Sequence, residues 1–197
     1  MAFGLYITHP QVRIDANVPV PRWGLSDVGA ARARAAAQSE WARKLGRIIS
    51  SDEVKAIETA EILSLASGIS IEIAEDTHEN DRSATGFLPP PQFEDAANWF
   101  FAHPEESFKG WERAVDAQSR IVSAVTRTLA AHDPSTPIAF VGHGGVGTLL
   151  KCHLTGSPIA RDRDQPGGGG NLFCFTLADR TLSCDWTPIE TWEGFLA

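Results

Sequence analysis

The sequence is poor in cysteine, and the few that it has exclude several kinds of site. Three of its 197 residues are cysteines: Cys152, Cys174 and Cys184. The number is odd, and no Cys-x-x-Cys or zinc-ligand spacing occurs, so we expect a reduced, cytoplasmic protein without a disulfide framework. The His-Glu-x-x-His spacing of zinc hydrolases is also missing, and we expect neither a metal nor a cofactor.

Long apolar runs and an excess of basic residues are missing as well. No apolar run approaches the roughly 18 residues that a membrane-spanning helix needs, and we expect no signal peptide. The net charge is −8, from 17 basic and 25 acidic residues. This balance argues against nucleic acid or an anionic membrane as a partner. It allows a small anionic substrate, because local charge decides binding. The oligomeric state stays open, with a homodimer as one option.

Apolar runs alternate with helix-forming stretches along the chain. We expect strands at 3–8, 47–50, 69–74 and 138–141, and a closing hairpin of 171–177 and 181–186. We expect helices at 26–45, 51–66, 92–102, 111–129 and 146–155, and a flexible loop at 161–170. This alternation predicts one α/β domain over residues 1–197, a three-layer α/β/α arrangement whose mostly parallel sheet is covered by helices on both faces.

Two of the predicted helices carry an apolar face. In the helix at 111–129 the predicted stripe follows spacings of four and three. Its members are Trp111, Val115, Gln118, Val122, Val125 and Leu129. In the helix at 51–66 the residues available for burial are Val54, Ile57, Ala60 and Leu65. We expect both faces to pack on the sheet.

Two histidines follow predicted strands. His9 follows the strand at 3–8, and His143 follows the strand at 138–141 with Gly144 and Gly145 directly after it. Open α/β sheets bind ligands at the carboxyl ends of their strands. Glycine beside a reactive side chain lets backbone N–H groups approach a ligand oxygen closely. The sequence therefore predicts one site that contains both histidines.

The glycine-rich segment allows two other interpretations. Gly142-x-Gly144-x-x-Gly147 fits the dinucleotide-binding fingerprint, but it lies late in the chain, and the loop at 161–170 replaces the expected second strand with its acidic residue. The sequence His143-Gly144-Gly145 is similar to the oxyanion loop of some hydrolases. That interpretation is weakened because the sequence contains no Gly-x-Ser-x-Gly elbow.

Four segments together resemble the histidine phosphatase superfamily, which includes the cofactor-dependent phosphoglycerate mutases and many broad phosphatases. They are Ile7-Thr8-His9-Pro10 and residues 24–29, 50–60 and 141–145, in the family's order. The resemblance spans about residues 3–177. It implies a phosphoglycerate mutase-like fold and an enzyme that hydrolyses a small phosphorylated substrate through a phosphohistidine. Whether it acts as a mutase or a phosphatase stays open.

The resemblance also implies roles for individual residues. His9 matches the histidine that attacks phosphorus, and His143 matches the one that hydrogen-bonds the transferring phosphoryl group. Lys55 occupies the place of an arginine near the start of the helix after the second strand. Glu79 is the best match for the general acid in the loop after the third strand, and Asp81 is the second choice.

These residue types suit phosphoryl transfer. The transferring group spreads negative charge over three oxygens, so catalysis depends mostly on positioning and cationic stabilisation. The nucleophile has to be a neutral imidazole with one nitrogen held by a fixed acceptor. The leaving alkoxide needs a proton, which a carboxylic acid on a loop supplies.

The sequence also departs from the family pattern. Thr8 replaces the arginine before the nucleophile, and Pro10 replaces a glycine and removes a backbone N–H. Lys55 offers a point charge where arginine would bind two oxygens. These changes keep a second interpretation open, in which the protein is a degenerate, non-catalytic phosphate-binding or scaffolding member of the same fold.

Loop residues provide candidates for the missing contacts. The phosphate-binding candidates are Lys55, Arg22, Arg13, Arg82 and the backbone at Gly144, with Arg22 first among the arginines and Arg13 second. Three aromatic residues of the insertion at 75–108 either line an apolar substrate pocket or pack against the protein. They are Phe87, Trp99 and Phe100.

Overall fold

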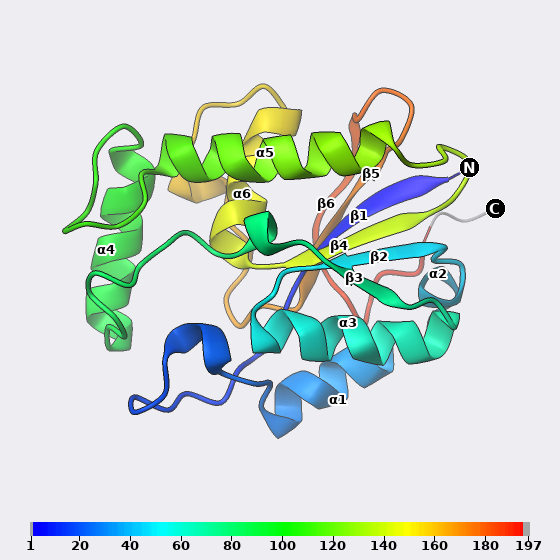
Figure 1. The fold of residues 1–197 in the computed structure, drawn as a ribbon, viewed down its shortest axis with the longest axis horizontal. Helices are drawn as coiled ribbons and strands as arrows, with labels where there is room; N and C mark the ends of the chain where they lie inside the picture. The colour runs from blue at the N-terminus through cyan, green and yellow to red at the C-terminus, as the bar shows by residue number, and fades with distance from the viewer. Residues whose placement is uncertain (1, 195–197) are drawn as a thin grey trace.

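A mixed sheet of six strands runs through the middle of the computed structural model, which describes residues 2–194 (Figure 1). The strand order is β3-β2-β4-β1-β5-β6. The strands are β1 (Phe3–Thr8), β2 (Arg47–Ser50), β3 (Ile71–Ile73), β4 (Ile138–Gly142), β5 (Asn171–Thr176) and β6 (Leu182–Pro188). The first four are parallel, whereas β5 and β6 form an antiparallel extension beside β1. The sheet is therefore mostly parallel, as predicted.

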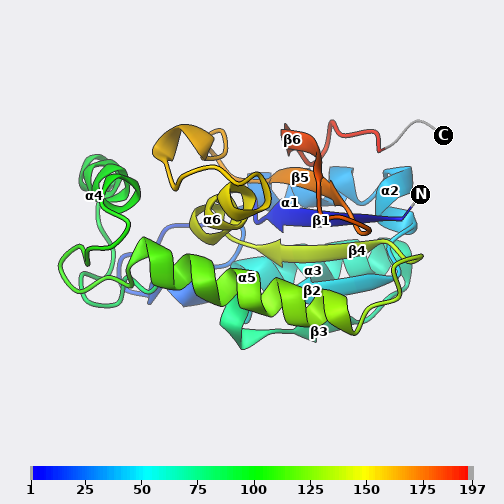
Figure 2. The same ribbon diagram turned by 90° about the horizontal axis from the view of Figure 1, so that it is seen from above.

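Helices cover both faces of the sheet (Figure 1). One face carries α1 (Asp27–Ala36), α2 (Glu40–Arg43) and α3 (Val54–Ser67), and the other carries α5 (Ala114–Ala130) and α6 (Gly144–Leu154). In Figure 2, α4 (Pro90–Ala102) lies apart from the sheet, beyond the carboxyl ends of the parallel strands. The three-layer α/β/α architecture predicted from the sequence is confirmed.

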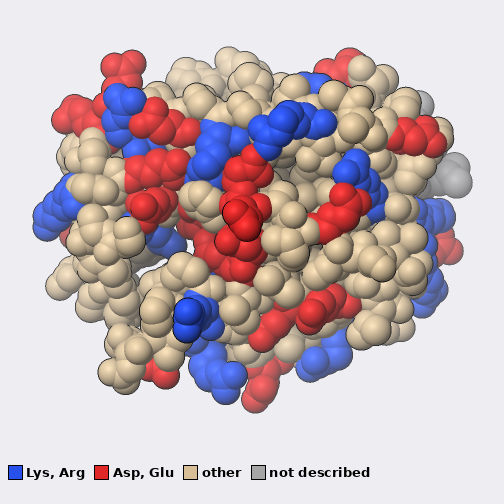
Figure 3. Space-filling model, in the orientation of Figure 1, with Lys and Arg blue, Asp and Glu red and all other residues tan. Residues whose placement is uncertain are grey.

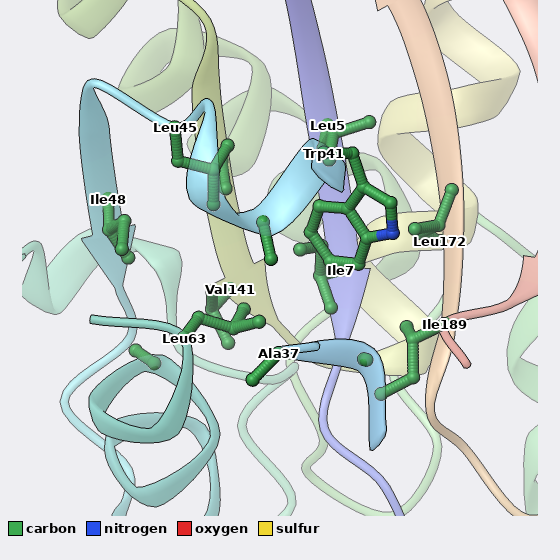
Figure 4. Packing of buried hydrophobic residues seen from close by; sticks show 14 of the residues in the cluster. Leu5, Ile7, Ala37, Trp41, Leu45, Ile48, Leu63, Val141, Leu172 and Ile189 are labelled. Carbon is green, nitrogen blue, oxygen red and sulfur yellow. The ribbon is translucent and has the colours of Figure 1, made fainter. Parts of the chain in front are cut away.

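The central strand β1 divides two hydrophobic cores. Successive side chains of a strand point to opposite faces of the sheet. Leu5 and Ile7 therefore enter the core around Trp41 beneath α1 and α3, as Figure 4 shows. Tyr6 enters the core beneath α5 and α6. Every residue of β1 is buried, which explains its nearly continuous apolar sequence.

The helix predicted over residues 26–45 is two helices. The chain leaves the helical path after Ala36, and α2 resumes at Glu40. The Ser39 hydroxyl donates to the Ala36 carbonyl at 2.6 Å, a local contact that competes with helix continuation. The turn brings Trp41 into the core, where its side chain is 2% exposed. Burial of this indole outweighs the alanine-rich helix propensity.

The buried helix faces also differ from the predicted ones. The buried residues of α5 are Ala114, Ala117, Ile121, Ala124 and Val125. Most of the predicted stripe flanks this face, because alanine lets the helix approach its neighbours closely while larger side chains fill the margins. In α3, Leu65 is 87% exposed, whereas Lys55 and Thr59 are buried. The prediction of Leu65 as a core residue is wrong.

Short 3-10 helices lie in three connecting segments. They are η1 (Val20–Arg22), η2 (Glu75–Thr77) and η3 (Arg161–Arg163). The last lies in the loop expected to be flexible. α6 begins two residues earlier than predicted, so the amides of Gly144 and Gly145 belong to its first turn. Among residues 2–194, no helix is both long and apolar enough to cross a membrane.

Candidate active site

The sheet brings the two predicted histidines together. β1 and β4 are parallel neighbours, with Thr8 opposite Gly142. The next residue, His9, donates its backbone N–H to the Gly142 carbonyl at 3.0 Å. The rings of His9 and His143 consequently lie 5.3 Å apart between centroids, with their planes inclined by 67°. Residues separated by most of the chain thus form one site.

The imidazole of His9 is held in one tautomer. Its Nδ1 lies 2.9 Å from the Pro10 carbonyl oxygen, and since a carbonyl only accepts, Nδ1 carries the proton. Nε2 therefore keeps a free lone pair. Burial lowers the pKa of His9 to about 3, and the neighbouring His143 and Lys55 act in the same direction. The ring is neutral at physiological pH, as a nucleophile requires.

The glycine-rich end of the loop before β5 covers the backbone of His9. The Gly170 amide donates to the His9 carbonyl at 2.9 Å. Gly169 has a φ of +63°, and a β-carbon there would lie 2.4 Å from the same carbonyl oxygen. Arg32 donates to the carbonyls of Gly169 and Gly170 at 2.8 and 2.9 Å and pairs with Glu190. The predicted flexible loop is thus tied down at this end.

His143 is completely buried and directly precedes α6. Its Nε2 lies 2.8 Å from the Ser51 hydroxyl oxygen. Its Nδ1 has no hydrogen-bond partner within the described part of the chain. Burial lowers the pKa of His143, although Glu53 and Glu79 raise it in part. Buried polar atoms are rarely left unpaired, so Nδ1 is available for a ligand.

The hydroxyl of Tyr6 holds the backbone of His143 with two hydrogen bonds. It accepts from the His143 amide and donates to the His143 carbonyl, both at 3.1 Å. A β-carbon on Gly142 would lie 2.6 Å from this hydroxyl, and one on Gly147 would lie 2.3 Å from the ring. These glycines make room for Tyr6.

The chain after α6 contradicts the dinucleotide-binding interpretation of the glycine-rich segment. The next strand, β5, is antiparallel to β1, whereas that interpretation expects a parallel strand, so it is wrong.

Lys55 is buried, at 3% exposure, and forms an ion pair with Glu53, a carboxylate that was not among the residues predicted from the sequence. Its Nζ pairs with Glu53 and donates to the Val20 carbonyl at 3.0 Å. Burial alone would raise the pKa of Glu53, but His143 and Lys55 lower it to about 2. Glu53 also lies 3.5 Å from Nε2 of His143. No sequence signal separates Glu53 from an ordinary acidic residue at a helix start.

Glu79 lies at the amino end of α6. Its carboxylate accepts from the amides of Gly145 and Val146 at 3.1 and 3.0 Å. Burial opposes ionisation of Glu79, but the nearby charges of His143 and Arg82 lower its pKa below the ordinary value. The carboxylate is therefore ionised here. It occupies amides that would otherwise attract an anion.

The loop that carries Glu79 is held by α5. Arg120 donates to the carbonyls of Asp76 and His78 at 3.1 and 2.9 Å and pairs with Glu112. The second-choice acid, Asp81, is exposed, and its carboxylate accepts from the Ser83 amide at 2.8 Å. Of the two candidate acids, Glu79 is the one beside His143.

The three candidate arginines lie in different surroundings. Arg82 is half-buried, with its guanidinium 5.0 Å from the Phe93 ring centre and 5.7 Å from that of Trp111. Within residues 2–194 this guanidinium has no hydrogen-bond acceptor, and its charge acts on both Glu79 and His143. The side chains of Arg13 and Arg22 are exposed. The surroundings of Arg82 therefore favour it over the arginines ranked first and second from the sequence.

The aromatic residues of the insertion pack against other rings. Phe100 is 2% exposed in the core. Trp99 stacks on His103 at 4.6 Å, and Phe87 lies 5.4 Å from Trp23. A nearby cavity of about 200 Å³ has other lining residues: Thr85, Leu88, Gln92, Asp95, Phe108 and Lys109. The structure favours packing for these three aromatic residues.

The surface in Figure 3 has no broad basic area. Acidic side chains gather near its centre, around the position of η2, and basic side chains are scattered among them. The same view shows a hollow between α4 and the segment that follows β1, on the side to which the parallel strands point. Among the described residues, no cluster of histidine, cysteine and carboxylate side chains could hold a metal ion.

The three-layer α/β/α fold brings the two histidines together at the ends of neighbouring parallel strands. Residues 13–184 match the histidine phosphatase superfamily (branch 1), and the chain belongs to this family. The match begins after His9, so the position of His9 in the site depends on the geometry described above. No curated protein sequence matches the chain at a significant level.

Solved structures share the fold at low sequence identity. The complex of a mycobacterial glucosyl-3-phosphoglycerate phosphatase with inorganic phosphate has a TM-score of 0.78 and 22% identity, over 98% of this chain and 100% of that one. A protein called mycobacterial hydrolase 1 has a TM-score of 0.76 and 20% identity, over 94% and 97%. Bacillus stearothermophilus YhfR has a TM-score of 0.76 and 19% identity, over 93% and 95%.

Proposed function

We propose that the protein hydrolyses a small phosphomonoester through a phosphohistidine on His9. The observation that carries the proposal is the state of this imidazole. It is neutral, its Nδ1 proton is held by the Pro10 carbonyl, and it lies beside His143. Its free nitrogen, Nε2, is the atom that attacks phosphorus.

The reaction has two steps. In the first, the Nε2 lone pair of His9 bonds to phosphorus while the bond from phosphorus to the ester oxygen breaks. The departing alkoxide takes a proton from the carboxylic acid of Glu79. In the second, a water oxygen attacks phosphorus while the Glu79 carboxylate accepts a proton from that water. The N–P bond breaks, inorganic phosphate leaves, and His9 regains its lone pair.

Glu79 has to gain a proton before the first step. It is ionised while it accepts from the amides of Gly145 and Val146. A phosphoryl group at the amino end of α6 competes for these amides and adds negative charge beside the carboxylate. Like charge raises a carboxyl pKa, so substrate binding itself favours the protonated acid.

Two groups support binding of the phosphoryl oxygens. Nδ1 of His143 is buried without a partner in the described chain, and Arg82 has a guanidinium without an acceptor there. The mycobacterial phosphatase of the same fold was solved with inorganic phosphate, which makes this anion a suitable probe. Lys55 contributes less than a free cation, because Glu53 shares its charge.

One observation favours a second candidate function, phosphate binding without turnover. Both the ammonium of Lys55 and the carboxylate of Glu79 already have partners inside the protein, namely Glu53 and the first turn of α6. A site that keeps these contacts with phosphate bound would lack a free acid. It would hold the anion and release it unchanged.

The test compares the wild type with His9→Ala on a panel of alkyl and aryl phosphates. With a substrate labelled with ³²P in its phosphoryl group, we expect the wild type to carry the label on His9 after a rapid quench that preserves phosphohistidine. We expect His9→Ala to lose roughly 10³-fold or more in rate. The control is His153→Ala, which changes an exposed histidine of α6. Wild-type turnover by His9→Ala would overturn the proposal. Phosphate binding without turnover by the wild type would favour the second candidate.

A further inference from the structure

The loop between α6 and β5 brings a side-chain amide to the start of α6. Nε2 of Gln165 lies so close to Gly144 that a β-carbon added to this glycine would be 2.2 Å away from it. Gly144 directly follows His143 and is the first residue of α6. The amide nitrogen therefore lies beside the histidine site, although Gln165 belongs to a different loop from either histidine.

Hydrogen bonds determine which end of the amide faces α6. Oε1 of Gln165 accepts from the Thr8 hydroxyl at 2.6 Å and from Nδ2 of Asn171 at 3.0 Å. Nδ2 of Asn171 also donates to the carbonyls of Pro166 and Gly169, both at 3.2 Å, so it is a donor. The atom of Gln165 that faces it must then be oxygen. The NH₂ group consequently faces the first turn of α6.

This NH₂ group has no acceptor among the described residues. The neighbouring His143 also has a buried Nδ1 without a partner there, which independently points to a ligand-binding site at this place. The amino end of a helix attracts anions. We propose that Nε2 of Gln165 donates a hydrogen bond to a phosphoryl oxygen of the substrate. The inference rests on the proposed function for the chemistry of this ligand.

Thr8 acquires a role in this arrangement. It directly precedes His9, is completely buried and carries no charge. Its hydroxyl accepts from the backbone N–H of Asn171 at 3.0 Å and donates to Oε1 of Gln165. Thr8 is therefore a positioning residue, which acts on the phosphoryl group through the amide of Gln165. The site gains a neutral donor at this position. Its positive charge comes from Arg82, which acts on His143 and has no acceptor in the described chain.

The experiment measures binding of inorganic phosphate by calorimetry and the inhibition constant of phosphate where turnover is found. Gln165→Leu removes the donor, and we expect it to raise the dissociation constant about tenfold, the usual effect of a lost hydrogen bond to a charged group. Gln165→Glu also places a carboxylate beside the anion, and its loss should be larger. Gln38→Glu makes the same charge change at an exposed turn residue and should bind phosphate like the wild type.

A second pair of variants tests the positioning role. Thr8→Val removes the hydroxyl and should weaken phosphate binding about threefold to fivefold, whereas Thr8→Ser restores a hydroxyl and should rescue it. Thermal unfolding of each variant identifies any that is not folded, and Gln165→Leu decides the matter if Gln165→Glu is unfolded. Folded Gln165→Leu with wild-type phosphate affinity would overturn the inference.

The inference and the proposed function can fail separately. If the wild type binds phosphate but hydrolyses nothing, the proposed hydrolysis fails, and the loss of affinity in Gln165→Leu still supports the contact. If the wild type hydrolyses phosphomonoesters and Gln165→Leu keeps the wild-type KM and phosphate affinity, the hydrolase proposal stands and the contact is overturned. A wild type that binds no phosphate overturns the contact.

Discussion

The ends of β4 and β1 each present a histidine, but they hold it in different ways. At the end of β4, Tyr6 holds the backbone of His143, Ser51 contacts its ring, and a helix begins at the next residue. At the end of β1, an irregular segment follows, and the ring of His9 is held by the carbonyl of the adjacent Pro10.

This difference separates two tasks of the site. The β4 end offers a buried ring nitrogen without a partner in the described chain, and helix amides that an anion can bind once it displaces the Glu79 carboxylate. The β1 end offers a neutral nucleophile but no cation of its own, so charge has to come from other elements. The charges of Arg82, in the loop before α4, and of Lys55, at the start of α3, both act on the paired histidine His143. The β1 end therefore depends more than the β4 end on residues from other elements for its positive charge.

The largest effect after loss of His9 is expected at the carboxylate that occupies the β4 end. If Glu79 protonates the leaving group, Glu79→Gln should slow hydrolysis of alkyl phosphates by roughly 10²–10⁴-fold. Aryl phosphates should lose less, because their leaving groups depart readily as anions. Steady-state rates on both substrate types check this. Glu61→Gln, on the exposed side of α3, is the control. Equal losses on both types would move the acid role to Asp81 or water.

A smaller effect should identify the cation that serves the two ends. A hydrogen bond to a charged group contributes about 1.5–3 kcal/mol, so Arg82→Ala should weaken phosphate or vanadate inhibition roughly tenfold or more. Arg22→Ala and Arg13→Ala change exposed arginines of the segment after β1 and serve as matched controls. A tenfold loss in Arg22→Ala, with none in Arg82→Ala, would restore the order inferred from the sequence.

A third effect concerns the pH dependence of stability, which reports the burial of the two histidine rings. The folded pKa of His9 is about 3, below the ordinary value near 6.5, so the unfolded chain binds this proton first as the pH falls. The stability that neutral His9 contributes is present above pH ~6.5 and is lost between about pH 6.5 and 3. The slope is at most about 1.4 kcal/mol per pH unit for each such group.

Urea denaturation at pH 7 and pH 5 measures this loss. The pKa of His143 is lowered as well, so both histidines should contribute in the same direction. His9→Ala should therefore lose less stability between these pH values than the wild type, whereas His153→Ala should match the wild type. Equal slopes in His9→Ala and the wild type would show that folding leaves the pKa of His9 at its ordinary value.

Much of the fold follows from local patterns. Apolar runs bounded by turn residues predicted the strands, and their alternation with helices predicted the layers. The buried face of α5 differs from the predicted stripe. The prediction used only the large side chains, whereas the face that packs on the protein consists mostly of alanines. Trp41 shows the same limit, since its burial breaks a helix that the alanine-rich sequence favours.

The sequence by itself determined the order of the strands along the chain and the two histidines that follow them, because these depend on neighbouring residues. Tertiary structure alone decided what surrounds the histidines. Ser51 and His143 are 92 positions apart, and Thr8 and Gln165 are 157 positions apart. The burial of Lys55 with Glu53 likewise depends on which elements cover α3. Such contacts arise only when the sheet closes, because hydrogen bonds and desolvation act over a few ångströms, whatever the separation along the chain.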